Sequence, residues 1–513
     1  MSNKISALLI FLFFSLFYSL FSIGHFGGDG YGDYLTAESL VLDQNLSLYD
    51  RPNDPDELNY LLNVGAPGRD GKIYSSRSGI GMPVILSLFY FPGHVASRFL
   101  KSIPHDYITM FFVSFANPIL SAFVCLFVFL IALTIGFNKR LSASLSFIYG
   151  LSTMAPIYTR TGFAEPAVTL FLLLAVYFMI KFNNSLKMLF LLLSAVAFSF
   201  SFAIKPNAAI FMPCFLFYLG WSLYDAKLEF REKLRMFILF VTISAVLFST
   251  IMLFNWYIYG SIFKFGGIDA VHAGVRMAES NHFLKGIYYY LFSTGKGLFL
   301  FNLPLVLSFA FLKNTPRERR KEVVFFILIF LVNLLFFVKS FRRGSLFSWG
   351  PRYLLPSIPV LVLLLGVMFY NYAKLFRKIV LFFFSAAGAL VMLPCLFINQ
   401  SKFYFFVKER LGIDEYLINF IPDLSPILGA WKMFISKISF KLFHVSQQFV
   451  YNPDYKLISP VAAKMDGYNN FDFWFIKIVN LAPKYNFVLI FVLIFMLALM
   501  VMSLYFLIKR LSK

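Results

Sequence analysis

The sequence predicts an all-α polytopic membrane protein with about twelve transmembrane helices and interfacial helices in its first extracytoplasmic loop. Of its 513 residues, 59% are hydrophobic and only 14% are charged. Soluble domains, by comparison, carry about 25% charged residues. The apolar residues gather in runs long enough to cross a bilayer. Because open sheet edges cannot face lipid, these runs are predicted to be helices.

Polar loops separate the apolar runs. We expect crossings near residues 5–26, 107–136, 141–158, 166–183, 187–204, 207–224, 236–258, 297–312, 323–339, 353–371, 377–397 and 486–508. The first run is predicted to be a retained anchor, because no small-residue cleavage site follows it. Residues 79–99 are also apolar, but counting them as a crossing would turn later basic loops outward. We therefore predict a helix at the outer interface there.

Basic residues mark one side of the membrane. The loops that contain "FNKR", "KNTPRERRKE" and "YAKLFRK", together with both termini, are rich in Lys and Arg and are predicted to be cytoplasmic. Much of the net charge of +21 therefore reflects topology, and we expect a lipid bilayer and no nucleic acid among the partners.

The loops suggest three parts. Residues 1–397 form a predicted transmembrane module, in which 28–105 are the first extracytoplasmic loop. Residues 398–485 are predicted to be an extracytoplasmic segment, and 486–513 the last transmembrane helix with a cytoplasmic tail. The outer loops differ in length and no internal repeat is visible, whereas transporters usually have matching halves.

Metal-ligand spacing is missing from the sequence. The cysteines Cys125, Cys214 and Cys395 lie inside apolar runs or at their edges, and the six histidines are scattered. We therefore predict no cofactor and no metal. A divalent ion held by Asp29 and Glu165 is an open alternative that the sequence does not favour.

The predicted outer face carries more cations than the positive-inside rule favours. Lys205, Lys296 and Arg352 each lie beside Pro or Gly at the end of a predicted span. Arg and Lys at this depth suit a phosphate, which guanidinium groups bind bidentately and ammonium groups bind as point charges. Elsewhere, as at Lys264 and Lys285, snorkelling toward lipid headgroups accounts for the outer cations.

The stretch "FGGDGYGDYLTAESL" places Asp29 and Asp33 just outside the first span. Transfer of a sugar from a lipid phosphate needs one base for the acceptor and cations for the leaving phosphate. A glycoside hydrolase typically needs two matched carboxylates. Asp29 is the better base, because it lies nearest the membrane and its glycine neighbours permit close approach. Asp33 is a substrate-binding candidate or, alternatively, the N-cap of the helix that follows.

These elements resemble the C-type membrane glycosyltransferases that use polyprenyl-phosphate sugars, a family that includes protein O-mannosyltransferases and the lipid A aminoarabinose transferase. The segment "GGDGYGDYLTAESLVLDQNLSL" is similar to the family's acidic first loop, which implies that Asp29 is the general base. The segment "GKIYSSRSGIGMPVILSLFYFPG" is similar to the family's basic residue before a Pro-containing interfacial helix. That likeness puts Arg77, with Lys72 and Tyr74, on the donor side.

Four later motifs extend the resemblance. In "RTGFAEP", Arg160 and Glu165 have the family's spacing, with Glu where the family usually has Asp. Lys205 in "AIKPN" matches a Lys at the outer end of a later span. "KGLFLFNLP" and "WGPRYLLPSIP" are similar to two further elements; in them Lys296 replaces the usual Arg and Arg352 is retained.

The resemblance implies an inverting glycosyltransferase that moves a single sugar from a polyprenyl-phosphate donor to a hydroxyl or amine of a glycolipid, glycan or protein acceptor. It also implies a multi-pass protein of a bacterial inner membrane, with both termini cytoplasmic and the active site extracytoplasmic. Two alternatives stay open. One is a flippase or transporter of a lipid-linked glycan, and the other is a glycan polymerase or ligase.

Overall fold

The computed structural model describes residues 2–25, 30–49, 65–75, 78–265, 268–269, 283–339, 348–369, 375–399, 401–413, 417–443 and 471–512. Within these ranges the chain is almost entirely helical, and its strands are only two or three residues long. The predicted all-α class is therefore confirmed.

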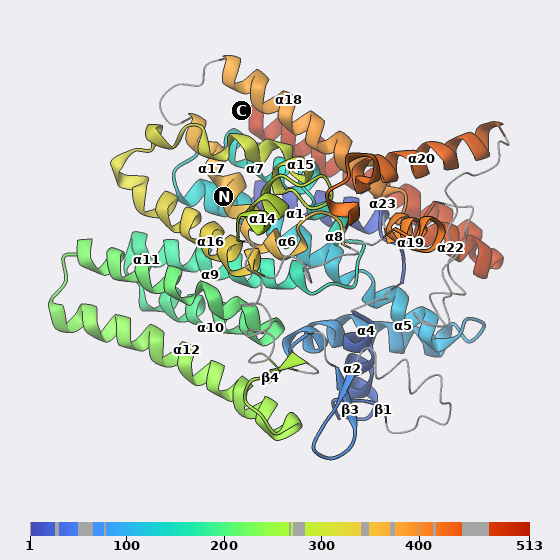
Figure 1. The fold of residues 1–513 in the computed structure, drawn as a ribbon, viewed down its shortest axis with the longest axis horizontal. Coiled ribbons are helices and arrows are strands. Elements are labelled where there is room, and N and C mark those ends of the chain that lie inside the picture. The colour runs from blue at the N-terminus through green and yellow to red at the C-terminus, as the bar shows by residue number, and fades with distance from the viewer. Residues whose placement is uncertain are drawn as a thin grey trace.

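The helices form a main bundle and a set of outer elements (Figure 1). The bundle helices are α1 (Ser2–Leu20), α6 (Ala116–Thr134), α7 (Lys139–Ser152), α9 (Glu165–Ser185), α10 (Met188–Ile204), α11 (Met212–Asp225), α12 (Phe230–Tyr259), α16 (Arg320–Val338), α17 (Ile358–Leu365), α18 (Leu375–Met392) and α23 (Asn486–Ser512). The remaining α-helices are α2 (Gly30–Leu42), α4 (Gly81–Phe99), α5 (His105–Val113), α8 (Ala155–Tyr158), α14 (Phe283–Leu291), α15 (Leu298–Phe301), α19 (Ser401–Leu411), α20 (Pro426–Phe443) and α22 (Trp474–Leu481).

Nine helical segments in the described ranges are long and apolar enough to cross a membrane. They are Asn3–Leu20, His105–Thr134, Glu165–Ser185, Pro206–Asp225, Phe230–Tyr259, Arg317–Val338, Arg352–Phe369, Leu375–Leu396 and Pro483–Ser512. Each corresponds to a predicted crossing. A tenth apolar helix, Met188–Ile204, is shorter and matches the predicted crossing at 187–204.

Two other predicted crossings are not continuous helices. The segment 141–158 is divided between α7 and α8, and the segment 297–312 is divided between α15 and the 3₁₀ helix η2 (Leu303–Phe309). Pro156 and Pro304 lie at the start of the second piece in each case. Because proline lacks the N–H that a helix interior requires, each apolar run breaks at this point. The predicted number of twelve is therefore not confirmed.

The buried core includes α6, which contacts both α9 and α17. Every residue of α17 is buried. The helices α12 and α23, by contrast, expose most of their apolar side chains, among them Leu253 and Phe487. Apolar surface of this kind suits contact with lipid chains.

Close helix contacts in the bundle rest on small residues and on hydrogen bonds to the main chain. The Tyr18 hydroxyl donates to the carbonyl oxygen of Gly150 at 2.9 Å, and the Ser194 hydroxyl donates to that of Ala175 at 2.9 Å. A Cβ atom at Gly150 would overlap the Phe14 ring. Small residues and hydroxyl groups at helix interfaces are typical of membrane proteins.

The first outer loop forms a separate layer at one end of the bundle (Figure 1). It contains α2, α4, α5 and a sheet in which β3 (Ile73–Ser75) pairs antiparallel with β1 (Ser47–Tyr49) and β2 (Gly65–Pro67), with Ala66 opposite Tyr74. The two short strands β4 (Lys264–Phe265) and β5 (Ile268–Asp269) form a second hairpin beyond α12.

The helix α4 is amphipathic. Its exposed face carries Val84, Leu88, Phe91, Val95 and Phe99, which recur every three or four residues. Its other face is buried against α2 and α5. An apolar stripe on one side of a helix outside the bundle is what an interfacial position requires, as predicted for residues 79–99.

The segment before α23 covers the outer end of α1. The Trp474 indole donates to the carbonyl oxygen of Ser19 at 2.9 Å, and the Trp474 amide donates to that of Ser22 at 3.0 Å. Gly24, which has a φ of +73°, lies directly against the Trp474 Cβ atom and leaves no room for a side chain. The exit of the first span is therefore fixed by a segment some 450 residues further along the chain.

Candidate functional site

Three charged residues from distant parts of the chain meet at the outer ends of their helices. Glu165 is the first residue of α9, Lys205 directly follows α10, and Arg352 begins the 3₁₀ helix η5 (Arg352–Ser357). The Nζ atom of Lys205 lies 2.6 Å from Oε1 of Glu165, and Nε of Arg352 lies 3.3 Å from the same oxygen. We call these three residues the Glu165 cluster.

Prolines next to the cluster explain its position. Pro206 follows Lys205 and prevents α10 from continuing, so Lys205 has an extended backbone and its side chain leaves the helix. Pro351 lies on the other side of its cation, directly before Arg352, which begins η5. The prolines that marked these span ends in the sequence therefore help to place the cations.

Aromatic rings hold the two cations. The Arg352 guanidinium lies over the rings of Phe163 and Tyr353, 4.1 and 5.0 Å from their centroids. The Lys205 ammonium lies 5.4 Å from the Tyr353 centroid. The side-chain amide of Asn333 holds Tyr353 in place, because it donates to the Tyr353 carbonyl oxygen at 3.1 Å. Cation–π contacts of this kind stabilise a partly desolvated positive charge.

The second carboxylate oxygen of Glu165, Oε2, is one of several buried polar atoms without a hydrogen-bond partner in the described part of the chain. Its side chain is only 3% exposed, and Oε2 accepts no hydrogen bond from any residue that the structure describes. A buried acceptor without a donor costs about 1–3 kcal/mol. Such an oxygen indicates a place for a donor that is not part of the described chain.

Lys296 is buried beside the cluster. Its ammonium group donates to the carbonyl oxygen of Ser348 and to the Ser348 hydroxyl, and it lies 5.1 Å from the Tyr404 ring centroid. Burial lowers the pKa of Lys296 well below its usual range, and the positive charge of Arg352 lowers it further. The electrostatic influence of Arg352 links Lys296 to the Glu165 cluster.

Arg160 has other partners, although it is close to Glu165 in sequence. Its guanidinium donates to the carbonyl oxygens of Cys395, of Ile398 at 3.1 Å and of Asp472 at 2.6 Å. Burial lowers the pKa of Arg160 to about 10, although the negative charge of Asp472 acts to raise this pKa. These main-chain contacts give Arg160 a structural position, in which it ties the end of α9 to the C-terminal outer segment.

A second buried charge cluster, centred on Asp472, was not predicted from the sequence. Asp472 accepts a hydrogen bond from the Asn399 amide at 2.7 Å and lies 3.5 Å from the Lys402 ammonium. Burial would raise the pKa of Asp472, but nearby positive charges, chiefly that of Lys402, hold it well below its usual range. The available signal was a lone carboxylate in the aromatic stretch "NNFDFWFIKI".

The predicted residues of the first loop lie in a different environment. Asp33 is buried, and its Oδ1 accepts a hydrogen bond from the Ser75 hydroxyl at 3.0 Å. In the described residues α2 already begins at Gly30, so Asp33 lies inside its first turn and the N-cap interpretation is wrong. Lys72 is exposed on the β2–β3 hairpin, where the Tyr74 hydroxyl donates to Asp70 at 2.7 Å.

A hollow lies between this loop and the outer end of α12. Tyr74, Gly79 and Asn255 are among the residues that line it. The Gly79 amide donates to the carbonyl oxygen of Ile204 at 2.8 Å, directly before Lys205. Asn255 is buried, and its Nδ2 has no hydrogen-bond partner among the described residues. The hollow therefore borders the turn that carries Lys205, and a buried amide without a partner among the described residues belongs to one of its lining side chains.

Two predicted residues, Asp29 and Arg77, lie outside the described residues. The predicted roles of Asp29 as base and of Arg77 on the donor side therefore stay predictions.

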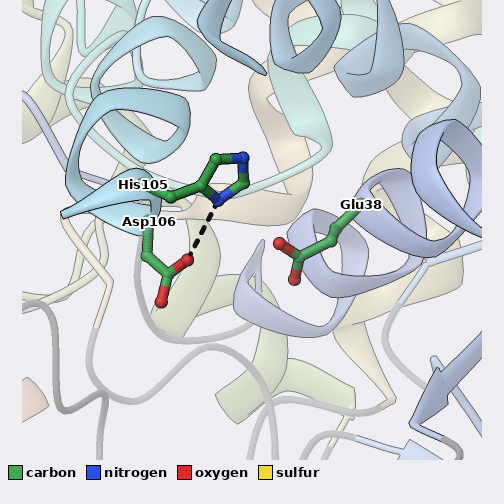
Figure 2. A group of neighbouring side chains, drawn as sticks. All are labelled: Glu38, His105 and Asp106. Carbon is green, nitrogen blue, oxygen red and sulfur yellow. Dashed lines mark hydrogen bonds and ion pairs between the residues drawn. The ribbon is translucent and has the colours of Figure 1, made fainter. Parts of the chain in front are cut away.

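Within the part of the chain that the structure describes, one group of side chains could hold a metal ion. Glu38, His105 and Asp106 each offer a ligand atom, and these atoms lie within 4.8 Å of one another (Figure 2). The group comes from α2 and α5 in the first outer loop and includes none of the residues predicted from the sequence.

No protein-family model matches the chain, and no curated protein matches it. Among solved structures, the chain is similar to the crystal structure of ArnT from Cupriavidus metallidurans in the apo state, with a TM-score of 0.44 and 12% sequence identity. The similarity covers 83% of this chain and 77% of that chain.

Proposed function

We propose that the protein is a membrane glycosyltransferase that moves a single sugar from a polyprenyl-phosphate donor to a hydroxyl or amine of an acceptor on the extracytoplasmic side. The observation that carries this proposal is the convergence of Lys205 and Arg352 on one oxygen of the buried Glu165. Two positive charges face one negative charge, and Lys296 adds a third cation nearby. The excess positive charge suits an anionic ligand.

The depth of the site favours a lipid-linked phosphate. Glu165, Lys205 and Arg352 all lie at helix ends, where a phosphate at headgroup level would meet them while its lipid chain lies between helices. Arg352 would bind phosphate oxygens through its planar guanidinium, and Lys205 would act as a point charge. Preorganised cations stabilise the charge that develops on a leaving phosphate.

Glu165 has two tasks in this proposal. Its Oε1 positions the two cations, and its Oε2 accepts a hydrogen bond from a hydroxyl group of the donor sugar. A sugar hydroxyl would satisfy the buried oxygen that has no donor in the described chain. The Asn255 amide and the Tyr74 side chain in the adjacent hollow would contact the donor from the side of the first loop.

The transfer step needs a base and a leaving group. We assign the base to Asp29, which takes the proton of the acceptor while the acceptor oxygen or nitrogen attacks the anomeric carbon. The bond between that carbon and the phosphate oxygen breaks, and polyprenyl phosphate leaves with the bonding electron pair. Attack opposite the leaving group inverts the anomeric configuration. Lys205, Arg352 and Lys296, with Arg77 and Lys72 from the first loop, neutralise the phosphate, and no metal takes part.

The position of the charges also favours an enzyme over a flippase. A path for a lipid-linked glycan would place charged residues at mid-membrane. The Glu165 cluster instead occupies helix ends on one side. A polymerase or ligase shares an Arg-rich outer face but does not require an acidic loop at the exit of the first span.

Mass spectrometry of cell-envelope lipids and glycans tests the proposal in four strains: wild type, deletion, Asp29→Asn and Asp225→Asn. Asp225 is a matched control, because it is 46% exposed and pairs with Lys321 away from the cluster. We expect the mass of one sugar to be missing from the same acceptor in the deletion and Asp29→Asn strains, and present in the Asp225→Asn strain.

Other results would contradict the proposal in distinct ways. If the deletion strain accumulated a lipid-linked precursor while Asp29→Asn behaved as wild type, the protein would be a flippase. Loss of a whole oligosaccharide would identify a polymerase or ligase. Sugar transfer at the wild-type rate by purified Asp29→Asn protein would remove Asp29 from the mechanism.

A further inference from the structure

The first outer loop contains a cluster of side chains with the donor atoms of a metal site. Glu38 projects from α2, and His105 and Asp106 occupy the first turn of α5, facing it (Figure 2). Nδ1 of His105 lies 3.2 Å from Oδ1 of Asp106, and one ligand atom of Glu38 lies within 4.8 Å of both residues' ligand atoms. None of the three belongs to the proposed transfer site.

Neighbouring side chains orient the cluster. The Tyr90 hydroxyl donates to Oε1 of Glu38 at 2.7 Å, and Nδ1 of His94 lies 3.1 Å from Nε2 of His105. Both residues come from α4, which packs between α2 and α5. Metal-ligating histidines and carboxylates in proteins are usually held in this way by a second layer of hydrogen bonds.

We propose that Glu38, His105 and Asp106 bind one divalent transition-metal ion, for which Zn²⁺ is the best match. One imidazole nitrogen and two carboxylate oxygens form a donor set that suits Zn²⁺ and is less suited to Mg²⁺, which prefers oxygen ligands alone. The ion ties α2 to α5 and so stabilises the first outer loop. It takes no part in sugar transfer.

The geometry supports this site. Ligands about 2.1 Å from a tetrahedral ion are separated by about 3.4 Å. The His105–Asp106 pair already has nearly this separation at 3.2 Å, and a ligand atom of Glu38 lies within 4.8 Å of the ligand atoms of both. The side chains of His105 and Asp106 are 34% and 60% exposed, so water can fill the fourth position and the ion can enter from solvent.

The imidazole protons of His105 and His94 can shift between ring nitrogens, so that the ion binds while the hydrogen bond between the two rings is kept. In the arrangement without metal, Nδ1–H of His105 donates to Asp106, and Nε2 of His105 accepts from His94. When the ion takes the place of the Nδ1 proton, Nε2 carries the hydrogen and donates to Nδ1 of His94. The hydrogen of His94 then moves to its Nε2, and the exposed Arg98, now 3.0 Å from that atom, turns away.

Zinc titration of the purified full-length protein tests the site. The protein carries an affinity tag without histidine, is stripped with EDTA and desalted, and is titrated with ZnCl₂ in a calorimeter. We expect wild type to bind one Zn²⁺ per chain. Glu38→Gln and His105→Ala should each lose saturable binding, and Asp225→Asn should bind as wild type does. His94→Ala should bind roughly 10–100-fold more weakly, because it removes only a second-layer partner.

A second measurement separates loss of the site from loss of folding. Thermal unfolding of each variant is compared in EDTA and in ZnCl₂, and we expect Zn²⁺ to raise Tm only in wild type and Asp225→Asn. The site would be refuted by wild type that binds no Zn²⁺, or by Glu38→Gln and His105→Ala variants that bind it as well as wild type. Binding of Mg²⁺ in place of Zn²⁺ would refute the transition-metal assignment.

Discussion

The Lys205 ammonium and the buried Glu165 carboxylate form a partly buried ion pair, with 2.6 Å between Nζ and Oε1, across the ends of α10 and α9. Arg352 approaches the same oxygen from η5. Together, these three residues join the ends of α9, α10 and η5. A ligand phosphate at this point would compete with Glu165 for two cations that are already oriented.

Replacing Glu165 with Gln should destabilise the protein. The substitution keeps the shape of the side chain but leaves Lys205 and Arg352 close together without a carboxylate. Removing one partner from a buried pair typically costs about 3–5 kcal/mol. A second change, Lys205→Met, should restore part of this loss in the double variant, and the coupling is measured as a double-mutant cycle of thermal unfolding in detergent.

The pair Asp225–Lys321 gives the matched cycle, because its carboxylate is 46% exposed whereas that of Glu165 is 3% exposed, and pairs open to solvent contribute about 0–1 kcal/mol. If the two cycles gave equal coupling energies, the Glu165 cluster would lack the electrostatic importance that we assign to it.

Arg352→Lys should reduce kcat/KM for the lipid-linked donor, and Arg352→Ala should reduce it by roughly 100-fold or more, the usual effect of removing one preorganised donor. Lysine keeps the charge but lacks the planar fork that binds two phosphate oxygens. It also loses the stacking on Phe163. Steady-state kinetics with the purified enzyme measure both variants.

Arg377→Lys is the control for this change, since Arg377 also lies over an aromatic ring, 4.8 Å from the Phe311 centroid, but outside the cluster. An equal loss of kcat/KM in Arg377→Lys and Arg352→Lys would show that stacking, and not phosphate binding, explains the effect.

Most of the fold could be predicted from hydropathy. Nine predicted crossings are found as membrane-length helices, because a long apolar run has few alternatives to a helix in lipid. The errors lie at 141–158 and 297–312, where Pro156 and Pro304 interrupt the helix without lowering the average hydropathy. A prediction that sums hydropathy over a window does not register such breaks.

The site could be predicted only in part. Glu165, Lys205 and Arg352 were recognisable because each is a charged residue at the end of an apolar run. The partners of Arg160 could not be predicted, since they are backbone carbonyl oxygens more than 200 residues away. The pairing of Asp472 with Lys402 and the meeting of Glu38 with His105 likewise depend on how separate helices pack.

Gly79→Ala should weaken the attachment of the first loop to α10. A Cβ atom at this position would overlap the carbonyl oxygen of Ala203, and the Gly79 amide bonds to Ile204 beside Lys205. Because a backbone oxygen cannot turn aside as a side chain can, we expect both a lower Tm and a higher KM for the donor. Gly220→Ala is the control, since no atom lies within 4 Å of its added Cβ. A Tm for Gly79→Ala equal to that of Gly220→Ala would contradict this account.

The charge of Lys296 should determine the alkaline limit of activity. Burial, with a contribution from Arg352, places the pKa of Lys296 well below its ordinary value. A protonated Lys296 is needed to neutralise the donor phosphate, so kcat/KM should fall as pH rises through this lowered pKa. The alkaline limb of the kcat profile should lie at higher pH than that of kcat/KM, because a bound phosphate stabilises the ammonium form of Lys296. Lys296→Arg should move both limbs upward, since arginine stays protonated throughout.

Stability should change with pH in the opposite direction. Between the lowered pKa in the folded protein and the ordinary pKa of about 10.4 in the unfolded chain, the unfolded chain binds more protons, so the free energy of unfolding rises with pH. The cost of burying the ammonium group is fully present below the folded pKa and disappears as pH rises. The Tm of wild type relative to Lys296→Met should therefore increase toward alkaline pH while activity declines. If the Tm and the kcat/KM of wild type both fell over this pH range, the enzyme would be unfolding. The loss of activity would then not be due to deprotonation of Lys296.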